Sequence, residues 1–242
     1  MIYFFLMRVN KYLALCGLGS RRHVESLVLS GRVRINGQVI TNLATTVAET
    51  DTVTVDQRPI SAPTDKVYLM LNKPAGVVST TRDPQHRTTV LDLLQQNPKQ
   101  YQTLFSRVRL YPVGRLDYHT QGLLLLTNDG DLTKQLTHPS THVNKIYVAV
   151  VDRPVTKAEL ETLSTGVKID GVMTAPAAFE FIKHDRTHIK VTIHEGRNRQ
   201  VRKMFATLGI QVLHLTRIQE GKLTLGNLAV GDWKFVRKSQ II

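Results

Sequence analysis

Apolar residues recur at helical spacing twice near the start of the chain. The first stripe occupies residues 9–16 and ends at Gly17. The second occupies residues 24–28; it follows Ser20, a residue type that favours the N-cap position. A glycine after each stripe is typical of helix C-termini. The pattern therefore predicts two short consecutive helices.

A hairpin is predicted directly after these helices. Two short strand-like runs, residues 32–35 and 38–40, flank Asn36-Gly37. Asn-Gly is the dipeptide that best suits a type I′ turn, because both positions tolerate a positive φ. We therefore predict a small domain of two helices and a hairpin over residues 7–60. Residues 61–66 are polar, contain proline and are interpreted as a linker.

Residues 67–242 alternate short strands with short helices and form the second predicted domain. Strands are predicted over residues 67–71, 123–127, 146–151, 178–182, 189–193, 212–215 and 233–236. Helices are predicted over residues 89–94, 132–136 and 200–208, and from the capping box at 156–159 to Gly166. Short connections among many strands favour an α+β fold with a mixed, mainly antiparallel sheet and flanking helices.

The charge balance changes this picture by suggesting a partner. The chain has 32 Lys and Arg against 19 Asp and Glu, a net charge of +13. Such an excess favours a polyanion, because each cation docked on a phosphate releases a condensed counterion. Charge alone leaves a merely basic soluble protein as the alternative. The candidate RNA-binding cations of the first domain are Arg8, Lys11, Arg21, Arg22, Arg32 and Arg34.

Cysteine use and hydropathy exclude several classes of protein. Cys16 is the only cysteine, so neither an intramolecular disulfide nor a Cys-based metal cluster can form. Residues 1–6 are apolar but far too short for a signal peptide or a membrane span, and we interpret them as an upstream start or an extension. No later run reaches membrane-spanning length. We expect a soluble, cytoplasmic protein with no membrane partner.

The signatures of common cofactors and metals are missing. Gly17-Leu18-Gly19 lacks the third glycine of a dinucleotide-binding loop, and no Walker loop occurs. A zinc helix motif beginning at His194-Glu195 would need a second histidine where Asn198 stands. These gaps argue against redox, nucleotide-hydrolysing and zinc chemistry. We expect neither a cofactor nor a metal.

Three blocks combine charged or aromatic side chains with turns and element ends. Residues 111–130 hold Asp117 in a glycine-containing turn between two apolar runs, with Arg115 just before it. An isolated Asp in such a place is more often a turn-capping residue than a catalyst. In the second block, Tyr147 opens an apolar strand, which is typical of a core aromatic with its hydroxyl at an edge.

The third block spans residues 195–205 and begins a predicted helix. Arg199 and Lys203 are four residues apart on its outer side, whereas Arg202 borders the apolar stripe beside Val201. A solvated charged face and a phosphate-binding edge are both consistent with such a cluster. Its four cations are Arg197, Arg199, Arg202 and Lys203.

Taken together, the blocks resemble the ribosomal RNA pseudouridine synthases of the RsuA/RluB type. The family's Gly-Arg-Leu-Asp motif stands intact at residues 114–117. The amino-terminal domain is similar to the RNA-binding module named after small-subunit ribosomal protein four. The resemblance covers about residues 8–237 and is carried by residues 19–22, 31–37, 72–74, 114–130, 145–147 and 195–205.

This resemblance implies an enzyme that isomerises uridine in ribosomal RNA to pseudouridine without a cofactor. It implies that Asp117 is the essential carboxylate, that Tyr147 stacks on the everted uracil and that Arg202 pairs with Asp117. Arg115 would steady the flipped nucleotide. Whether Asp117 attacks the sugar or removes a sugar proton stays open. The resemblance adds three cations to the RNA-binding candidates, namely Lys73, Arg197 and Arg199.

The target and the class of protein leave alternatives. The large-subunit enzymes are more similar to this chain at Tyr118, residues 120–122 and residues 196–200. We therefore expect an enzyme that acts on large-subunit ribosomal RNA. We also expect it to be a monomer. A small-subunit enzyme is the first alternative, and a non-catalytic assembly protein that binds ribosomal RNA is the second. A deaminase or methyltransferase is disfavoured by the missing zinc and cofactor motifs.

Overall fold

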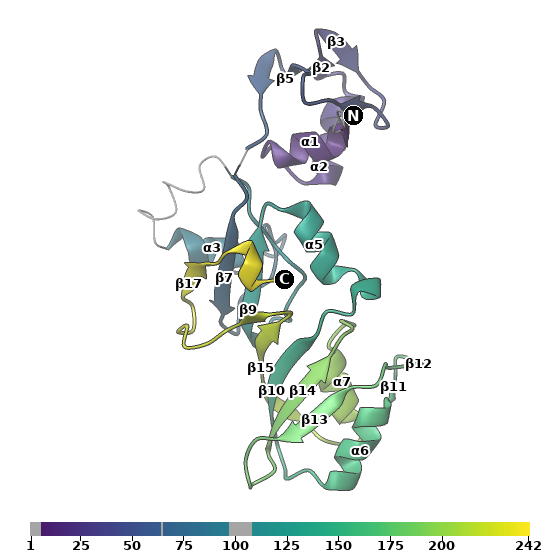
Figure 1. Cartoon of the computed structure of the whole chain (residues 1–242), viewed down its shortest axis with the longest axis vertical. Helices are drawn as coiled ribbons and strands as arrows, with labels where there is room; N and C mark the ends of the chain where they lie inside the picture. Colours follow the sequence, from purple (N-terminus) through teal and green to yellow (C-terminus); the bar gives the residue numbers. More distant parts are fainter. Residues whose placement is uncertain (1–5, 64, 97–107) are drawn as a thin grey trace. The chain divides into compact units, whose positions relative to one another are not determined.

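The computed structural model describes residues 6–63, 65–96 and 108–242 and divides the chain into two compact units (Figure 1). Of the described residues, one unit contains 6–63, 65–66 and 108–110, and the other contains 67–96 and 111–242. No helix in these described ranges is long and apolar enough to cross a bilayer.

The first unit packs two helices against a small antiparallel sheet. Helix α1 (Val9–Leu15) and helix α2 (Arg21–Leu29) are those predicted from the apolar stripes, and the Ser20 hydroxyl caps α2 by accepting from the His23 amide at 3.2 Å. Strands in this unit are β1 (Met7–Arg8), β2 (Val33–Ile35), β3 (Gln38–Ile40), β4 (Thr46–Val47), β5 (Val53–Val55) and β6 (Arg58–Ile60). Their order in the sheet is β3-β2-β5-β6, while β1 pairs with β4.

The predicted hairpin is confirmed in detail. Strands β2 and β3 pair in antiparallel register with Ile35 opposite Gln38. The two turn residues between them have φ values of 51° at Asn36 and 83° at Gly37, as a type I′ turn requires. The valine side chains of α1, α2, β2 and β5 meet in one core, so helices and sheet fold as a unit.

The second unit is built on one nine-stranded sheet of order β13-β14-β10-β15-β9-β7-β17, with β16 beside β15 and β8 beside β9. Among the described strand pairs of this sheet, only that of β15 with β9 is parallel, which confirms the mixed, mainly antiparallel sheet. The strands are β7 (Tyr68–Lys73), β8 (Tyr111–Pro112), β9 (Thr120–Thr127), β10 (Lys145–Val151), β13 (Ala178–Phe181), β14 (His188–Ile193), β15 (Val212–Glu220), β16 (Leu223–Thr224) and β17 (Trp233–Phe235).

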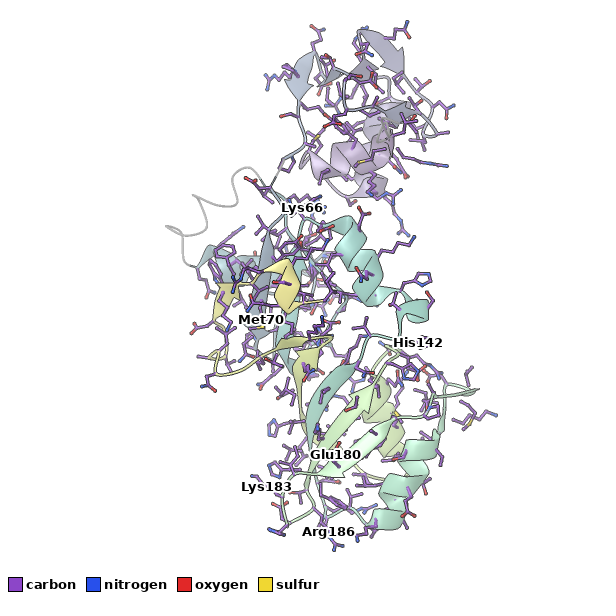
Figure 2. All side chains as sticks on the ribbon, in the orientation of Figure 1. Lys66, Met70, His142, Glu180, Lys183 and Arg186 are labelled. Atoms are coloured by element: carbon purple, nitrogen blue, oxygen red, sulfur yellow. The ribbon has the colours of Figure 1, made fainter. Side chains whose placement is uncertain are left out.

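Helices and a small hairpin flank this sheet. The helices are α3 (Val90–Gln95), α5 (Gly130–Thr137), α6 (Lys157–Thr165) and α7 (Gln200–Ala206), with 3-10 turns η1 (Pro139–Thr141) and η2 (Lys238–Gln240). Strands β11 (Lys168–Ile169) and β12 (Val172–Met173) form a separate hairpin. The sheet runs the length of the unit, so Met70 in β7 and Glu180 in β13 lie far apart (Figure 2).

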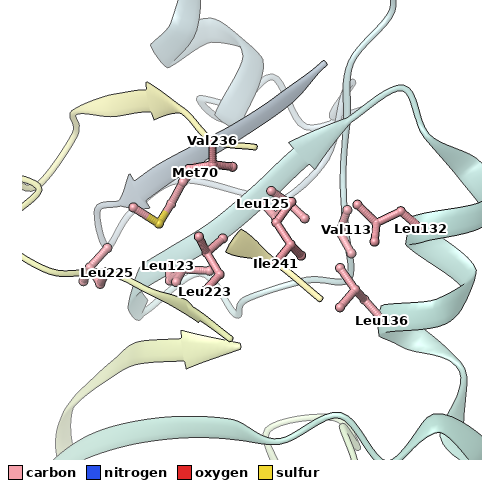
Figure 3. Close-up of a cluster of buried hydrophobic side chains, with 10 residues drawn as sticks. All are labelled: Met70, Val113, Leu123, Leu125, Leu132, Leu136, Leu223, Leu225, Val236 and Ile241. Carbon is pink, nitrogen blue, oxygen red and sulfur yellow. The ribbon is translucent and has the colours of Figure 1, made fainter. Parts of the chain in front are cut away.

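Strand β9 is buried on both faces, which explains its uninterrupted run of four leucines. Leu123 and Leu125 point into a cluster with Met70, Leu132 and Leu136, where β7, β9 and α5 meet the end of the chain (Figure 3). This packing holds the start of β9, and the turn before it, against a rigid support. That turn contains residue 117.

One strand is longer than its sequence pattern predicts. The apolar run indicated residues 212–215, whereas β15 extends from Val212 to Glu220. Its second half is polar in sequence, yet Arg217 and Glu220 are each only 2% exposed. Because buried charges interrupt an apolar pattern, periodicity alone ended the strand too early.

Candidate active site

The candidate site is a cavity of about 770 Å³ that lies within the second unit. Its walls come from the loop after β7, the turn before β9, strands β10 and β15, and the segment that leads into α7. Five residues singled out from the sequence line it: Arg115, Asp117, Tyr147, Arg197 and Arg199. The fold therefore brings together three blocks that are far apart in sequence.

The backbone around Asp117 is fixed by partners on both sides. The buried Ser79 hydroxyl donates to the Leu116 carbonyl at 2.9 Å and accepts from the Leu116 amide at 3.1 Å. The Asp117 carbonyl accepts from the Thr120 amide at 3.0 Å, and the Gly76 amide donates to the Tyr118 carbonyl at 2.8 Å. The Asp117 carboxylate takes no part in these contacts. Ser79 was not singled out from the sequence.

The turn before β9 and the strands β10 and β15 place Asp117, Tyr147 and Arg217 around the cavity. Arg217 in β15 is paired with Gly122 of β9 on one side and with Tyr147 of β10 on the other. All but Gly122 line the cavity. Asp117 is close enough to Tyr147 to act on it electrostatically.

Tyr147 lies in strand β10, so the sheet and not a loop presents its ring to the cavity. The residue is only 8% exposed. Burial raises the pKa of its phenol, and the neighbouring Arg217 guanidinium opposes that rise. The phenol therefore stays protonated at neutral pH. The sequence predicted a core aromatic with its hydroxyl at an edge, and the structure confirms the burial.

Lys73 requires a correction. The sequence analysis grouped it with the RNA-binding cations, but its side chain is fully buried. Its ammonium donates to the Pro74 and Val77 carbonyls, each at 2.8 Å. Burial lowers the pKa of Lys73 to about 8, and the nearby Asp117 carboxylate counteracts the shift. Lys73 does not line the cavity, and its ammonium holds the backbone of the loop after β7 instead of facing solvent.

Arg202 lies behind the Asp117 turn and does not line the cavity. Its guanidinium donates to the Val212 carbonyl and, at 3.2 Å, to the His119 carbonyl. Burial lowers the pKa of Arg202, as does Arg199, while Asp117 opposes the shift. Among the ion pairs of the described residues, none joins Arg202 to Asp117. The predicted pairing stays a prediction, and the observed role is to brace the segment after Asp117.

The remaining predicted RNA-binding cations differ in their exposure to solvent and in their contacts within the protein. Arg197 donates to the carbonyls of Ile169, Val172 and Met173, so it ties the β11–β12 hairpin to the cavity rim. Arg115 and Arg199 are exposed at the rim. In the first unit Arg8, Arg21, Arg22, Arg32 and Arg34 are exposed and Lys11 is half-buried. Arg32 is paired with Asp56. Their RNA contacts stay predictions.

The described ranges contain no group of three or more His, Cys, Asp or Glu side chains that could hold a metal ion. The cavity lining carries several cations, two phenols and four carboxylates, namely Asp83, Asp117, Glu195 and Glu220. A carboxylate beside an aromatic ring, in a space of base-binding size, suits an everted nucleobase.

Comparison with known proteins follows the same division. The family model described as RNA pseudouridylate synthase matches residues 67–207, more than half of the chain, and the S4 domain model matches residues 7–53. The chain is similar to a solved structure titled crystal structure of pseudouridylate synthase, with 28% identity, a TM-score of 0.67 and coverage of 97% of both chains.

Two curated relatives point to different ribosomal subunits. Ribosomal large subunit pseudouridine synthase B of Bacillus subtilis is 39% identical over 229 residues, 93% of this chain and 90% of the relative. Ribosomal small subunit pseudouridine synthase A of Pseudomonas aeruginosa is 35% identical over 238 residues, 97% of this chain and 99% of the relative.

Proposed function

The chain belongs to the RNA pseudouridylate synthase family, with an amino-terminal S4 domain, and we propose that the uridine it isomerises lies in large-subunit ribosomal RNA. The observation that carries this assignment is the 39% identity with the large-subunit enzyme of B. subtilis along 93% of the chain. The residue types at positions 118, 120–122 and 196–200 support it. We propose further that the enzyme works in the cytoplasm as a monomer.

The isomerisation breaks the bond between ribose C1′ and N1 of the base, turns the detached uracil and joins C1′ to C5. The C5 proton is lost and N1 gains a proton, so no electrons are exchanged with a co-reactant. The base must leave its stack to enter the cavity. We propose that Asp117 acts on the ribose, as a nucleophile or as a base, while the ring of Tyr147 supports the uracil.

The subunit assignment is tested by mapping pseudouridines in ribosomal RNA from cells with and without the gene. We expect one or a few positions in large-subunit RNA to lose pseudouridine in the deletion strain and to regain it on complementation. Loss confined to small-subunit RNA would favour the small-subunit alternative. An unchanged map of both RNAs would instead favour an assembly protein.

Removal of Arg202 is expected to lower activity strongly. Arg202→Ala withdraws a hydrogen bond to the His119 carbonyl, which braces the segment following Asp117, and a second one to the Val212 carbonyl of β15. It also removes a positive charge near the Asp117 carboxylate. A misplaced catalytic group costs about 10²-fold in rate. Single-turnover pseudouridine formation on a ribosomal RNA fragment measures the loss.

Lys203→Ala is the matched control, because it removes a cation from the same helix that pairs outward with Asp170. Its rate should equal that of the wild type. A rate for Arg202→Ala within a few-fold of this control would show that Arg202 does not support Asp117.

A further inference from the structure

Four ionisable side chains share one face of strands β10 and β15 at the cavity. Lys145 is opposite Glu220 and Tyr147 is opposite Arg217 in the antiparallel register. All four line the cavity. Each cross-strand pair therefore sets a charged or polar group of β10 beside an oppositely charged or hydrogen-bonding group of β15.

A bulge makes this arrangement possible. Side chains alternate along a strand, so residues three apart, such as Arg217 and Glu220, should point to opposite faces. Gln219 and Arg217 pair with the consecutive residues Ile146 and Tyr147, which leaves Ile218 as an extra residue. One extra residue restores the same face for Arg217 and Glu220. Bulges re-aim side chains and are frequent next to active sites.

The arginine is held on two sides. Its Nε donates to the Leu123 carbonyl of β9 at 2.8 Å, and one terminal nitrogen lies 3.2 Å from a Glu220 carboxylate oxygen. Both side chains are 2% exposed. With Nε and one edge of the guanidinium fixed in this way, the group has one orientation, and it interacts with the Tyr147 phenol in the adjacent register position.

Stability is a poor explanation for such a pair. Desolvation of two charges offsets most of their attraction, and well-packed apolar side chains often replace a buried ion pair without loss. What distinguishes Arg217 from an apolar residue is a guanidinium held in one orientation beside the Tyr147 phenol, its neighbour across the strand pair. A guanidinium fixed there can interact with the hydroxyl and so oppose displacement of the ring on which the uracil is expected to rest.

We propose that Arg217, anchored by Glu220 and Leu123, is a positioning residue that holds the Tyr147 ring in place through its hydroxyl. This inference rests on the proposed role of Tyr147 in supporting the uracil. Arg217 acts on the reaction through Tyr147, so its contribution disappears when the hydroxyl is absent.

A double-mutant cycle tests this dependence. Arg217→Gln with Glu220→Gln removes both charges together, since removal of one alone would leave the other buried and unpaired. We expect kcat to fall about tenfold, an energy within the range of coupled neighbours, with KM for RNA nearly unchanged. Tyr147→Phe should cause a similar fall. The combination of all three changes should be no slower than Tyr147→Phe alone.

Two further variants serve as a control and as a substitute test variant. Glu180→Gln with Lys190→Gln removes an exposed cross-strand pair of β13 and β14, and its kcat should match that of the wild type. Arg217→Lys keeps the charge opposite Glu220 but loses the planar guanidinium, and it should show the same dependence on the Tyr147 hydroxyl. It serves as the test variant if the neutral pair does not fold, which thermal denaturation reveals.

Additive losses in the cycle, with equal effects of the Arg217 change in the wild-type and Tyr147→Phe backgrounds, would overturn the inference. Total ribosomal RNA from the deletion strain is the substrate, because it contains the targets of both subunits. A wrong subunit assignment then changes which RNA gains pseudouridine, and the cycle still reports on Arg217.

Discussion

Asp117→Asn is expected to bind ribosomal RNA as tightly as the wild type and to form no pseudouridine. The amide has the size and shape of the carboxylate but is neither a nucleophile nor a base. The turn should be preserved, because Ser79, Gly76 and Thr120 hold its backbone without using the carboxylate. Loss of an essential catalytic group lowers kcat by at least about 10³-fold.

The measurement is single-turnover pseudouridine formation, with RNA affinity determined on the same preparation. Asp185→Asn is the matched control, because it makes the same chemical change at an exposed position in the turn between β13 and β14. Mass spectrometry of the variant excludes deamidation back to Asp. Turnover by pure Asp117→Asn would contradict the catalytic role. Loss of RNA binding would show that the carboxylate shapes the binding surface instead.

Much of the fold could be predicted from local patterns. The helix after Ser20 and the hairpin at Asn36-Gly37 have their causes within a few residues of sequence, namely a side-chain cap and a turn that needs positive φ. The Thr156 capping box likewise marks the start of α6 correctly. Such elements are predictable because the interactions that define them are local.

The burial of the cations in and near the cavity could not be predicted in this way. Lys73 and Arg217 have ordinary sequence surroundings, and only the tertiary fold buries them. Lys73 was interpreted as an RNA-binding cation, and Arg217 was not singled out at all. The available signal for Arg217 was indirect, since Arg217 and Glu220 follow an apolar run and precede Gly221 without any loop-forming residues. Their register, and hence their shared face, depends on a bulge that periodicity does not reveal.

The catalytic role of Asp117 could be predicted only from the combination of several motifs. An Asp in a glycine-containing turn has a common structural explanation, and only the agreement of several blocks in order marked it as a candidate catalyst. The structure adds the cavity that it lines and the Ser79 hydrogen bonds that fix its neighbour Leu116. The sequence shows the order of the blocks along the chain. Their proximity in the folded protein depends on the parallel pairing of β9 with β15, which the sequence does not reveal.

That pairing leads to the second large effect, which is expected from Gly122→Ala. A Cβ atom at residue 122 would lie 2.2 Å from the Arg217 carbonyl oxygen and 2.7 Å from the Arg217 amide nitrogen. The φ of Gly122 is +105°, a conformation that side-chain-bearing residues rarely adopt. Both atoms that the Cβ would meet belong to the backbone of the neighbouring strand β15, so they cannot move without opening the sheet.

We expect Gly122→Ala to lower the free energy of unfolding by about 3–5 kcal/mol, the sum of backbone strain and overpacking. The corresponding fall in Tm is on the order of 10 °C, followed by circular dichroism. Gly171→Ala separates the two causes, because Gly171 also has a positive φ, +82°, but no atom lies within 4 Å of its added Cβ. That control should cost about 1 kcal/mol, the strain alone.

Equal destabilisation by the two glycine substitutions would mean that strands β9 and β15 do not approach each other as closely as described. If the approach is correct, activity should respond too. Arg217 lies in β15, between Leu123 of β9 and Tyr147 of β10. Displacement of its backbone therefore moves the guanidinium away from the Leu123 carbonyl and from Tyr147. Gly122→Ala should therefore form pseudouridine about tenfold more slowly, the loss expected from removal of the Arg217 contacts, even at temperatures where it is fully folded, whereas Gly171→Ala should retain the wild-type rate.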